Sequence, residues 1–256
     1  MNNTRLILVT ILLVLLTALL GWLTGILLNY LADVLPRTRS FSRPVCHVCG
    51  KERQGKELLF PQKCSQCQAP PTRRTWWVQL LALILVPVLW FFPPRALGFW
   101  IALVVFIYLA IVFIIDMEHR AVLREVSIVG LILAIPFGLW LNGWKNTLLG
   151  FAVGAGVMLA LYYLGILFTR WMSRRRGEVI GEVALGFGDV TLSAILGIAL
   201  GYPRIIVCLL FAILLGGLVS AGFILIMAAR KRYQAFTAIP YAPFLVIAAA
   251  GLLYIA

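Results

Sequence analysis

Two groups of residues in this sequence could do chemistry: a pair of aspartates beside apolar segments, and four cysteines within one polar segment. Asp116 ends the apolar run from 106 to 115, and Asp189 follows Gly186-Phe187-Gly188 and opens another apolar run. An ionisable group at membrane depth costs a few kcal/mol on insertion scales and is a functional candidate by default. Two carboxyl groups that share a site do not both ionise comfortably, so one can activate water as a base while the other protonates a carbonyl as an acid.

The glycines before Asp189 suit such a site. Gly186 and Gly188 allow backbone or substrate to approach closely, and they permit a positive φ before the helix. The competing interpretation is that Asp116 and Asp189 are ordinary interfacial charges near Arg120 and Arg176. The residues alone leave both interpretations open. The third aspartate, Asp33, is interpreted as an interfacial residue at a helix end.

The cysteines form two Cys-x2-Cys pairs separated by 14 residues, the pattern of a structural zinc site with four thiolate ligands. The ligands are Cys46, Cys49, Cys64 and Cys67. A segment of this size cannot fold by core burial alone, so a metal would supply its folding energy. Two disulfides are the rival interpretation, which a reducing cytoplasmic location disfavours. A closed four-ligand site leaves no position for a reacting water, so no catalysis is assigned to it.

The elements that position these residues are predicted to be membrane-spanning helices. Hydrophobic residues make up 62% of the 256 residues and charged residues 12%, whereas a soluble domain carries about 25% charged residues. The apolar residues run in blocks of spanning length. The expected fold is therefore an all-α, polytopic membrane bundle of about eight helices. The predicted helices cover residues 6–32, 77–92, 96–115, 125–141, 146–169, 189–201, 204–229 and 239–256. Gly154 and Gly156 are expected to allow close helix packing.

The positive charge orients this bundle. The net charge is +13, and the cations lie in short clusters between apolar blocks, a pattern typical of membrane topology and not of a nucleic-acid surface. With eight helices, 18 of the 22 cations fall on the side of the 33–75 loop. This places the large loop in the cytoplasm, both aspartates at the cytoplasmic face of the membrane and both termini outside. Three parts are expected: a first, retained transmembrane helix (1–35), a cytoplasmic zinc-binding loop with the four cysteines (36–76) and a transmembrane domain (77–256).

Five features, in order along nearly the whole chain, resemble the type IV prepilin leader peptidases. The sequence Gly186-Phe187-Gly188-Asp189 looks like the GxGD signature of intramembrane aspartyl proteases. The other features are Asp116, the two Cys-x2-Cys pairs, Leu35-Pro36-Arg37 and the stretch Ile239-Pro240-Tyr241-Ala242-Pro243-Phe244. The resemblance implies an aspartic endopeptidase of the bacterial inner membrane, in which Asp116 and Asp189 correspond to the catalytic pair. Its substrates would be prepilin or pseudopilin precursors, which lose a short basic leader at the cytoplasmic face.

Many members of that family also methylate the new N-terminus with S-adenosylmethionine. Here the cysteine loop is short, and Thr75-Trp76 and Gln79 replace the Tyr-Pro and Glu usually seen as the second helix begins. These changes weaken the implication of methylation, whereas the carboxylates of the peptidase site are intact. Leu123-Arg124 and Thr191 also depart from the family pattern beside the two aspartates.

Two other functions are compatible with these residues. The first is a non-catalytic zinc-knuckle membrane scaffold or assembly factor for a pilus or secretion system, which need not keep both aspartates. The second is a transporter that relays protons through the aspartates. Transporters commonly contain internal repeats, and the sequence shows none. The substrate's identity and the oligomeric state do not follow from the sequence.

Overall fold

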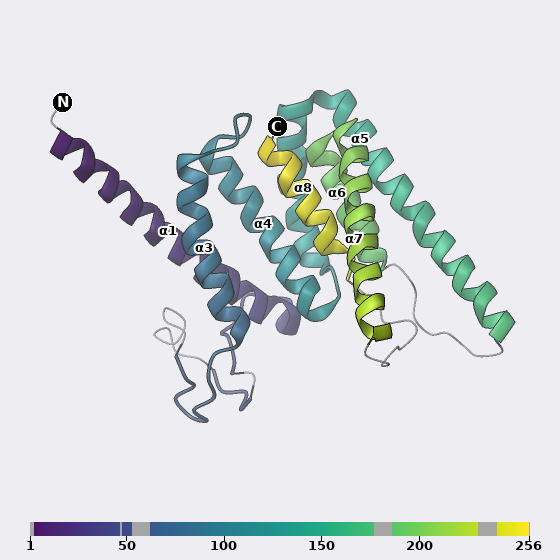
Figure 1. Cartoon of the computed structure of the whole chain (residues 1–256), viewed down its shortest axis with the longest axis horizontal. Helices are drawn as coiled ribbons and strands as arrows, with labels where there is room; N and C mark the ends of the chain where they lie inside the picture. The colour runs from purple at the N-terminus through teal and green to yellow at the C-terminus, as the bar shows by residue number, and fades with distance from the viewer. Residues whose placement is uncertain (1–2, 47, 53–61, 177–185, 230–239, 256) are drawn as a thin grey trace. The chain divides into compact units, whose positions relative to one another are not determined.

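The computed structural model describes residues 3–46, 48–52, 62–176, 186–229 and 240–255. Within these ranges the chain is helical, with an isolated β-bridge between Val45 and Glu52 as its only extended pairing. The predicted all-α class is therefore confirmed. The helices, labelled as in Figure 1, are α1 (Asn3–Thr38), α3 (Arg73–Phe91), α4 (Gly98–His119), α5 (Arg124–Arg176), α6 (Phe187–Leu200), α7 (Arg204–Ala229) and α8 (Ala242–Ile255).

The described residues contain seven helical elements where the sequence predicted about eight helices, and α5 accounts for the difference. Its 53 residues contain a break at Gly143, which has φ 72° and ψ 165°. The predicted helices 125–141 and 146–169 are the two runs on either side of this glycine. A positive φ is accessible to glycine at little cost, so Gly143 lets the chain turn between the two runs while helical residues continue on both sides.

The helices have the lengths and compositions of a multi-pass membrane protein. Five elements, α1, α3, α4, α5 and α7, are long and apolar enough to cross a membrane. The other two, α6 and α8, have 14 residues each and are therefore about 21 Å long, short of a 30 Å hydrocarbon core. Ten of the α6 residues are buried. A short helix near the middle of a bundle is covered by protein and need not match the bilayer thickness.

The chain forms two compact units, Met1–Ile111 and Val112–Ala256, and the boundary falls inside α4. In the first unit α1 packs against α3. A Cβ atom on Gly21 would lie 2.6 Å from the carbonyl oxygen of Ala82, so the two backbones are too close for a side chain at this point. Small residues permit such close packing in membranes.

Polar contacts tie the same two helices together. The buried Gln79 side chain donates a hydrogen bond from Nε2 to the Trp22 carbonyl at 2.8 Å. Near the polar segment, Arg74 at the start of α3 forms an ion pair with Asp33 near the end of α1. Asp33 is therefore an ion-pair partner at a helix end, which agrees with its interpretation as an interfacial residue.

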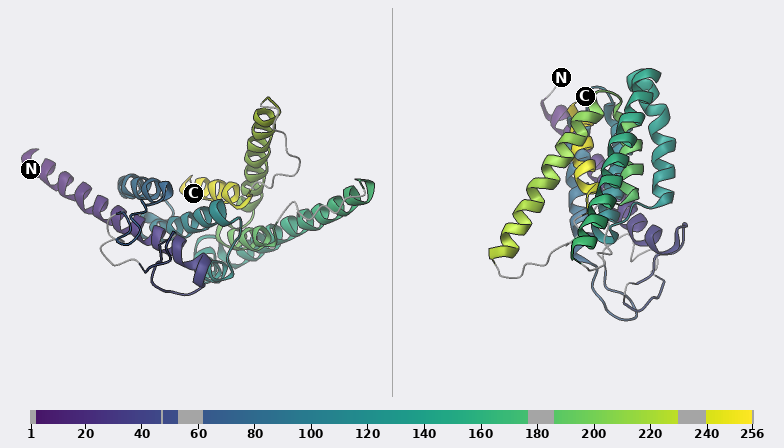
Figure 2. Two further views of the ribbon diagram at one scale, coloured as in Figure 1. Left: turned by 90° about the horizontal axis from the view of Figure 1, so that it is seen from below. Right: turned by 90° about the vertical axis from the view of Figure 1, so that its right-hand side faces the viewer.

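The second unit is built on α6. The face of α6 that carries Ser193 and Gly197 packs against Gly150 and Gly154 of α5, and the Ser193 hydroxyl donates a hydrogen bond to the Gly154 carbonyl at 2.9 Å. Helix α8 packs against both α7 and α6. The views in Figures 1 and 2 show that the C-terminal parts of α5 and α7 diverge from each other. Asp116 and Asp189 both belong to this unit.

Candidate active site and cysteine cluster

Asp116 lies in the last turn of α4 and is 4% exposed. The helix ends just after it, because Arg120 adopts a left-handed conformation (φ 50°) and its N–H closes the turn on the Asp116 carbonyl at 2.8 Å. The side-chain atom Oδ2 is buried and has no hydrogen-bond partner among the described residues. A buried carboxyl oxygen without a partner is costly to maintain, which makes Asp116 a candidate for contact with a ligand.

Residues 120–123 carry the chain from α4 to α5 and bring it against the start of α6. A Cβ atom on Gly188 would lie 2.9 Å from Cβ of Val122. The absence of a side chain at Gly188 therefore lets the α4–α5 connection reach the residue that precedes Asp189. This contact couples the end of the helix that carries Asp116 to the start of the helix that carries Asp189.

Asp189 lies in the first turn of α6 and is 8% exposed. Its N–H donates a hydrogen bond to the Gly186 carbonyl at 3.1 Å. The backbone amides of Gly186 and of Ala242, at the start of α8, act as hydrogen-bond donors to its carboxylate. The carboxylate therefore lies where the starts of α6 and α8 meet.

The structure brings the two predicted carboxyls together. They lie close enough to interact electrostatically, although 73 positions separate them in the sequence. In the described part of the chain, the ion pairs are Arg43–Glu52 and Arg74–Asp33, and neither involves Asp116 or Asp189. The Arg120 residue is exposed, and the side chain of Arg176 lies outside the described residues. Two buried carboxyls within electrostatic range of each other, without an ion pair among the described residues, are unlike two charges neutralised at a surface.

The two glycines differ in their roles. The expected close approach is present at Gly188, whereas a Cβ on Gly186 would make an ordinary 3.6 Å contact with Oδ2 of Asp189. The expected positive φ is wrong: Gly186 has φ −76°, and Gly188 is not among the positive-φ residues. The start of α6 uses ordinary extended backbone at Gly186, so steric room at Gly188 is the physical need.

The start of α8 contributes residues beside Asp189, which was not predicted from the sequence. Ala242 donates to Asp189 through its backbone, and the phenol of the preceding residue, Tyr241, also interacts electrostatically with Asp189. Both residues lie in the stretch 239–244 that carried the family resemblance. The signal that could have found them is a Pro-flanked polar residue directly before an apolar helix.

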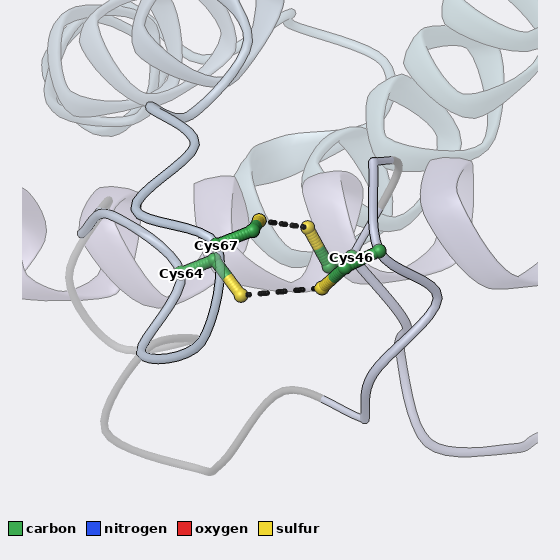
Figure 3. Close-up of side chains that lie close together, drawn as sticks. Cys46, Cys64 and Cys67 are labelled. Carbon is green, nitrogen blue, oxygen red and sulfur yellow. Dashed lines mark hydrogen bonds between the residues drawn. The ribbon is translucent and has the colours of Figure 1, made fainter.

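The four cysteines converge in the first unit. Their sulfur atoms all lie within 4.8 Å of one another, and Figure 3 shows the labelled side chains of Cys46, Cys64 and Cys67 pointing toward one another. The distances Cys46 Sγ–Cys67 Sγ and Cys49 Sγ–Cys64 Sγ are both 3.7 Å. A disulfide bond is about 2.05 Å long, so these are free thiols. A tetrahedral ion with metal–sulfur bonds of about 2.3 Å places its ligands about 3.8 Å apart, so the cluster has the dimensions of a metal site.

The two knuckles share one backbone pattern. In each, the residue four positions after the first cysteine donates a hydrogen bond from its N–H to the carbonyl of that cysteine. The bonds run from Gly50 to Cys46 and from Gln68 to Cys64, both at 3.0 Å. Both of these turn residues adopt a left-handed conformation, with φ 71° and 56°. The turns direct each pair of sulfurs to the same side. Gly50 and Gln68 are structural residues of the site that the spacing of cysteines alone does not reveal.

The knuckle backbone also favours thiolates. The N–H groups of Cys49 and Val48 hydrogen-bond the Cys46 sulfur and lower its pKa to about 6. The N–H groups of Cys67 and Gln66 lower the pKa of Cys64 in the same way. Since the thiolate is the form that binds a metal ion, the backbone favours the metal-binding form of Cys46 and Cys64, whereas burial and the neighbouring sulfurs raise the pKa of Cys67 to about 11.

Comparison with known proteins agrees with this geometry. Residues 103–221, a little under half of the chain, match the type IV leader peptidase family. The matched region includes both aspartates and the Val122–Gly188 contact between them. The cysteine cluster lies outside it.

Three relatives share the name "Prepilin leader peptidase/N-methyltransferase". The one from Myxococcus xanthus is 27% identical over 83% of this chain and 63% of its own length. The one from Aeromonas hydrophila is 30% identical over 75% of this chain and 61% of its own length. This chain thus spans less than two thirds of either relative. The relative from Pseudomonas aeruginosa is 29% identical over 92% of this chain and 88% of its own length. No solved structure matches the chain.

Proposed function

Since residues 103–221 match the type IV leader peptidase family, we propose that the chain is a membrane aspartyl endopeptidase that removes the leader peptide of prepilin-like or pseudopilin-like precursors. The observation that carries this proposal is the meeting of two buried carboxyls, Asp116 and Asp189, at adjoining helix ends. Gly186 and Gly188 position the start of α6, with Gly188 providing the room that the connection before α5 needs.

The proposed reaction is hydrolysis of one peptide bond. One carboxylate takes a proton from a water molecule as the water oxygen attacks the scissile carbonyl carbon. The other, protonated carboxyl gives its proton to the carbonyl oxygen, which forms a tetrahedral intermediate. As the C–N bond breaks, the carboxyl that gained the water's proton passes it to the leaving amine, and the gem-diol returns its second proton to the other carboxylate. Both carboxyls regain their starting states, so no further cofactor is needed for this step.

A cleavage assay tests the proposal. We expect a co-expressed prepilin to lose its leader with the wild-type chain and to remain uncleaved with Asp116→Asn or Asp189→Asn, while both variants still insert in the membrane. Asp33→Asn is the matched control, because it makes the same change at the remaining aspartate and should leave cleavage intact. Leader removal that survives Asp189→Asn would leave the non-catalytic scaffold as the better account.

The cysteine cluster fits a structural zinc ion. Cys46, Cys49, Cys64 and Cys67 would hold it, and the 3.7 Å sulfur separations match a tetrahedron of four thiolates. The ion would supply folding energy to residues 36–76 and take no part in hydrolysis, because four protein ligands close its coordination shell. S-adenosylmethionine-dependent methylation is not part of the proposal.

We place the protein in the bacterial inner membrane, with the cysteine loop, Asp116 and Asp189 on the cytoplasmic side. The support is the concentration of Lys and Arg in the loop that carries the cysteines and in the last turns of α5. A basic leader at that face would meet a site whose two ionisable residues are both acids. Prepilin precursors and membrane lipids are the proposed partners, and nucleic acid is not.

A further inference from the structure

The hydroxyl group of Tyr241 is a second buried polar group beside Asp189 that the acid–base pair does not use. Its oxygen is buried and has no hydrogen-bond partner among the described residues. The residue directly follows Pro240, and its backbone carbonyl accepts the N–H of Phe244 at 3.0 Å in the first turn of α8. The next residue, Ala242, donates its N–H to the Asp189 carboxylate. The phenol is therefore held on the segment that touches the proposed catalytic group.

The ring of Tyr241 is fixed by packing. It lies against Phe244 with ring centroids 6.4 Å apart, and its edge is 3.6 Å from the position of a Cβ on Gly216 in α7. The ionisable groups that act on the phenol are Asp189 and Cys208, and the Cys208 thiol is already directed at the Leu245 carbonyl at 3.8 Å. The hydroxyl thus lies within electrostatic range of Asp189 without a hydrogen bond to it, and a buried donor in this position is available to a third group.

We propose that Tyr241 is a further catalytic residue, whose hydroxyl donates a hydrogen bond to the scissile carbonyl oxygen of the substrate when that bond lies between Asp116 and Asp189. The proposal rests on the peptidase function proposed above. Negative charge develops on this oxygen as water attacks, and a fixed donor in a site shielded from water stabilises it without reorganisation. Asp116 also has a buried oxygen without a hydrogen-bond partner, Oδ2. Polar atoms on α4 and just before α8 are therefore both available to hydrogen-bond a substrate.

The test is Tyr241→Phe in the purified, full-length protein, assayed with a detergent-solubilised prepilin. The substitution keeps the ring and its contact with Phe244 and removes only the hydroxyl. Loss of one oxyanion donor lowers kcat by about 10²–10³-fold in other enzymes. We expect a fall in kcat of about 10²-fold, with KM changed less than about threefold and thermal stability unchanged. Tyr254→Phe, the same change near the other end of α8 at a residue that is 43% exposed, is the matched control.

The outcomes separate this role from others. A kcat within threefold of wild type, or an unchanged kcat with a raised KM, would overturn the proposal. A loss of activity matched by a fall in melting temperature would assign Tyr241 a structural role and overturn it as well. Asp189→Asn run in parallel separates the two proposals: if Asp189→Asn is inactive and Tyr241→Phe is fully active, the peptidase function stands and the role of Tyr241 falls.

Discussion

At the scale of single residues, the two glycines of the motif before Asp189 should respond differently to the same substitution. Gly188→Ala would put a Cβ 2.9 Å from Cβ of Val122, whereas Gly186→Ala would make an ordinary 3.6 Å contact. Overpacking of this kind costs about 1–3 kcal/mol. We expect Gly188→Ala to lower the melting temperature and the cleavage rate, and Gly186→Ala to affect the melting temperature little. Thermal unfolding of the purified variants measures the difference.

A second-site change checks the cause. Val122→Gly removes the Cβ and the methyl groups that lie nearest to Gly188, so the double variant Gly188→Ala/Val122→Gly should recover part of the lost stability relative to Gly188→Ala alone. Equal stability of the Gly186 and Gly188 variants, or a double variant no better than the single one, would contradict the steric explanation.

The sequence singles out the two aspartates proposed to be catalytic, whereas it does not reveal their surroundings. An aspartate beside an apolar segment is visible because charged groups are costly there, and this sufficed to select Asp116 and Asp189. Their meeting depends on the left-handed Arg120 and on the Val122–Gly188 contact. Both features depend on which helix ends lie next to each other in the fold, and the hydropathy of the sequence does not reveal which ends these are. The role of Tyr241 is hidden for the same reason.

At the scale of elements, the packing of α5 on α6 depends on one of two nearby glycines. A Cβ on Gly154 would lie 2.5 Å from the Ser193 carbonyl oxygen, whereas one on Gly156 would meet nothing within 4 Å. Gly154→Ala should therefore push α6 away from α5, lower the melting temperature and reduce cleavage, because Asp189 is carried by α6. Gly156→Ala, two residues along the same helix, is the control. Thermal unfolding and cleavage assays of both variants measure the difference. Equal losses of stability and cleavage in the two variants would contradict this packing of α5 on α6.

Sequence reasoning treated these two glycines alike, and the structure distinguishes them. Helical periodicity separates residues two apart by about 200° around the axis, so only one of the pair can face α6. The choice between them requires the direction of the neighbouring helix.

The helix spans were easier to predict, because the thickness of the bilayer and the need to satisfy backbone hydrogen bonds within it fix the length of an apolar helix. The break within α5 at Gly143 falls between the predicted helices 125–141 and 146–169, whereas the positive φ of Gly143 was not predicted.

The cysteine cluster makes a prediction at the same scale. Cys46→Ser or Cys64→Ser removes one of four converging sulfurs and should lower bound zinc from one ion per chain to near none after dialysis, since a structural site depends on its full ligand set. Cys208→Ser changes the cysteine outside the cluster, whose thiol faces a carbonyl on α8, and should retain the ion. Elemental analysis of the purified proteins measures the content. Zinc content that is unaffected by the loss of Cys46 would contradict the assignment.

At the scale of the whole molecule, the distribution of cations predicts topology. With the loop at 33–75 inside and eight membrane crossings, the C-terminus lies outside. Alkaline phosphatase fused after Ala256 should be active, and the same enzyme fused after Pro71 should be inactive, because it folds only outside the cytoplasm. Green fluorescent protein at the two positions should give the reverse pattern. Activity of the phosphatase at Pro71 would reverse the orientation and place the aspartates on the wrong side for a cytoplasmic leader.

The measurement that most directly tests the account is the cleavage rate of Asp116→Asn, Asp189→Asn and the double variant, in purified protein with one prepilin substrate. Residues that act as a unit lose about as much singly as together. The account predicts that each single variant lowers the rate by about 10³-fold or more and that the double variant lowers it no further. A single variant that retains a tenth of the wild-type rate, or a double variant far slower than either single one, would contradict the pairing of Asp116 with Asp189.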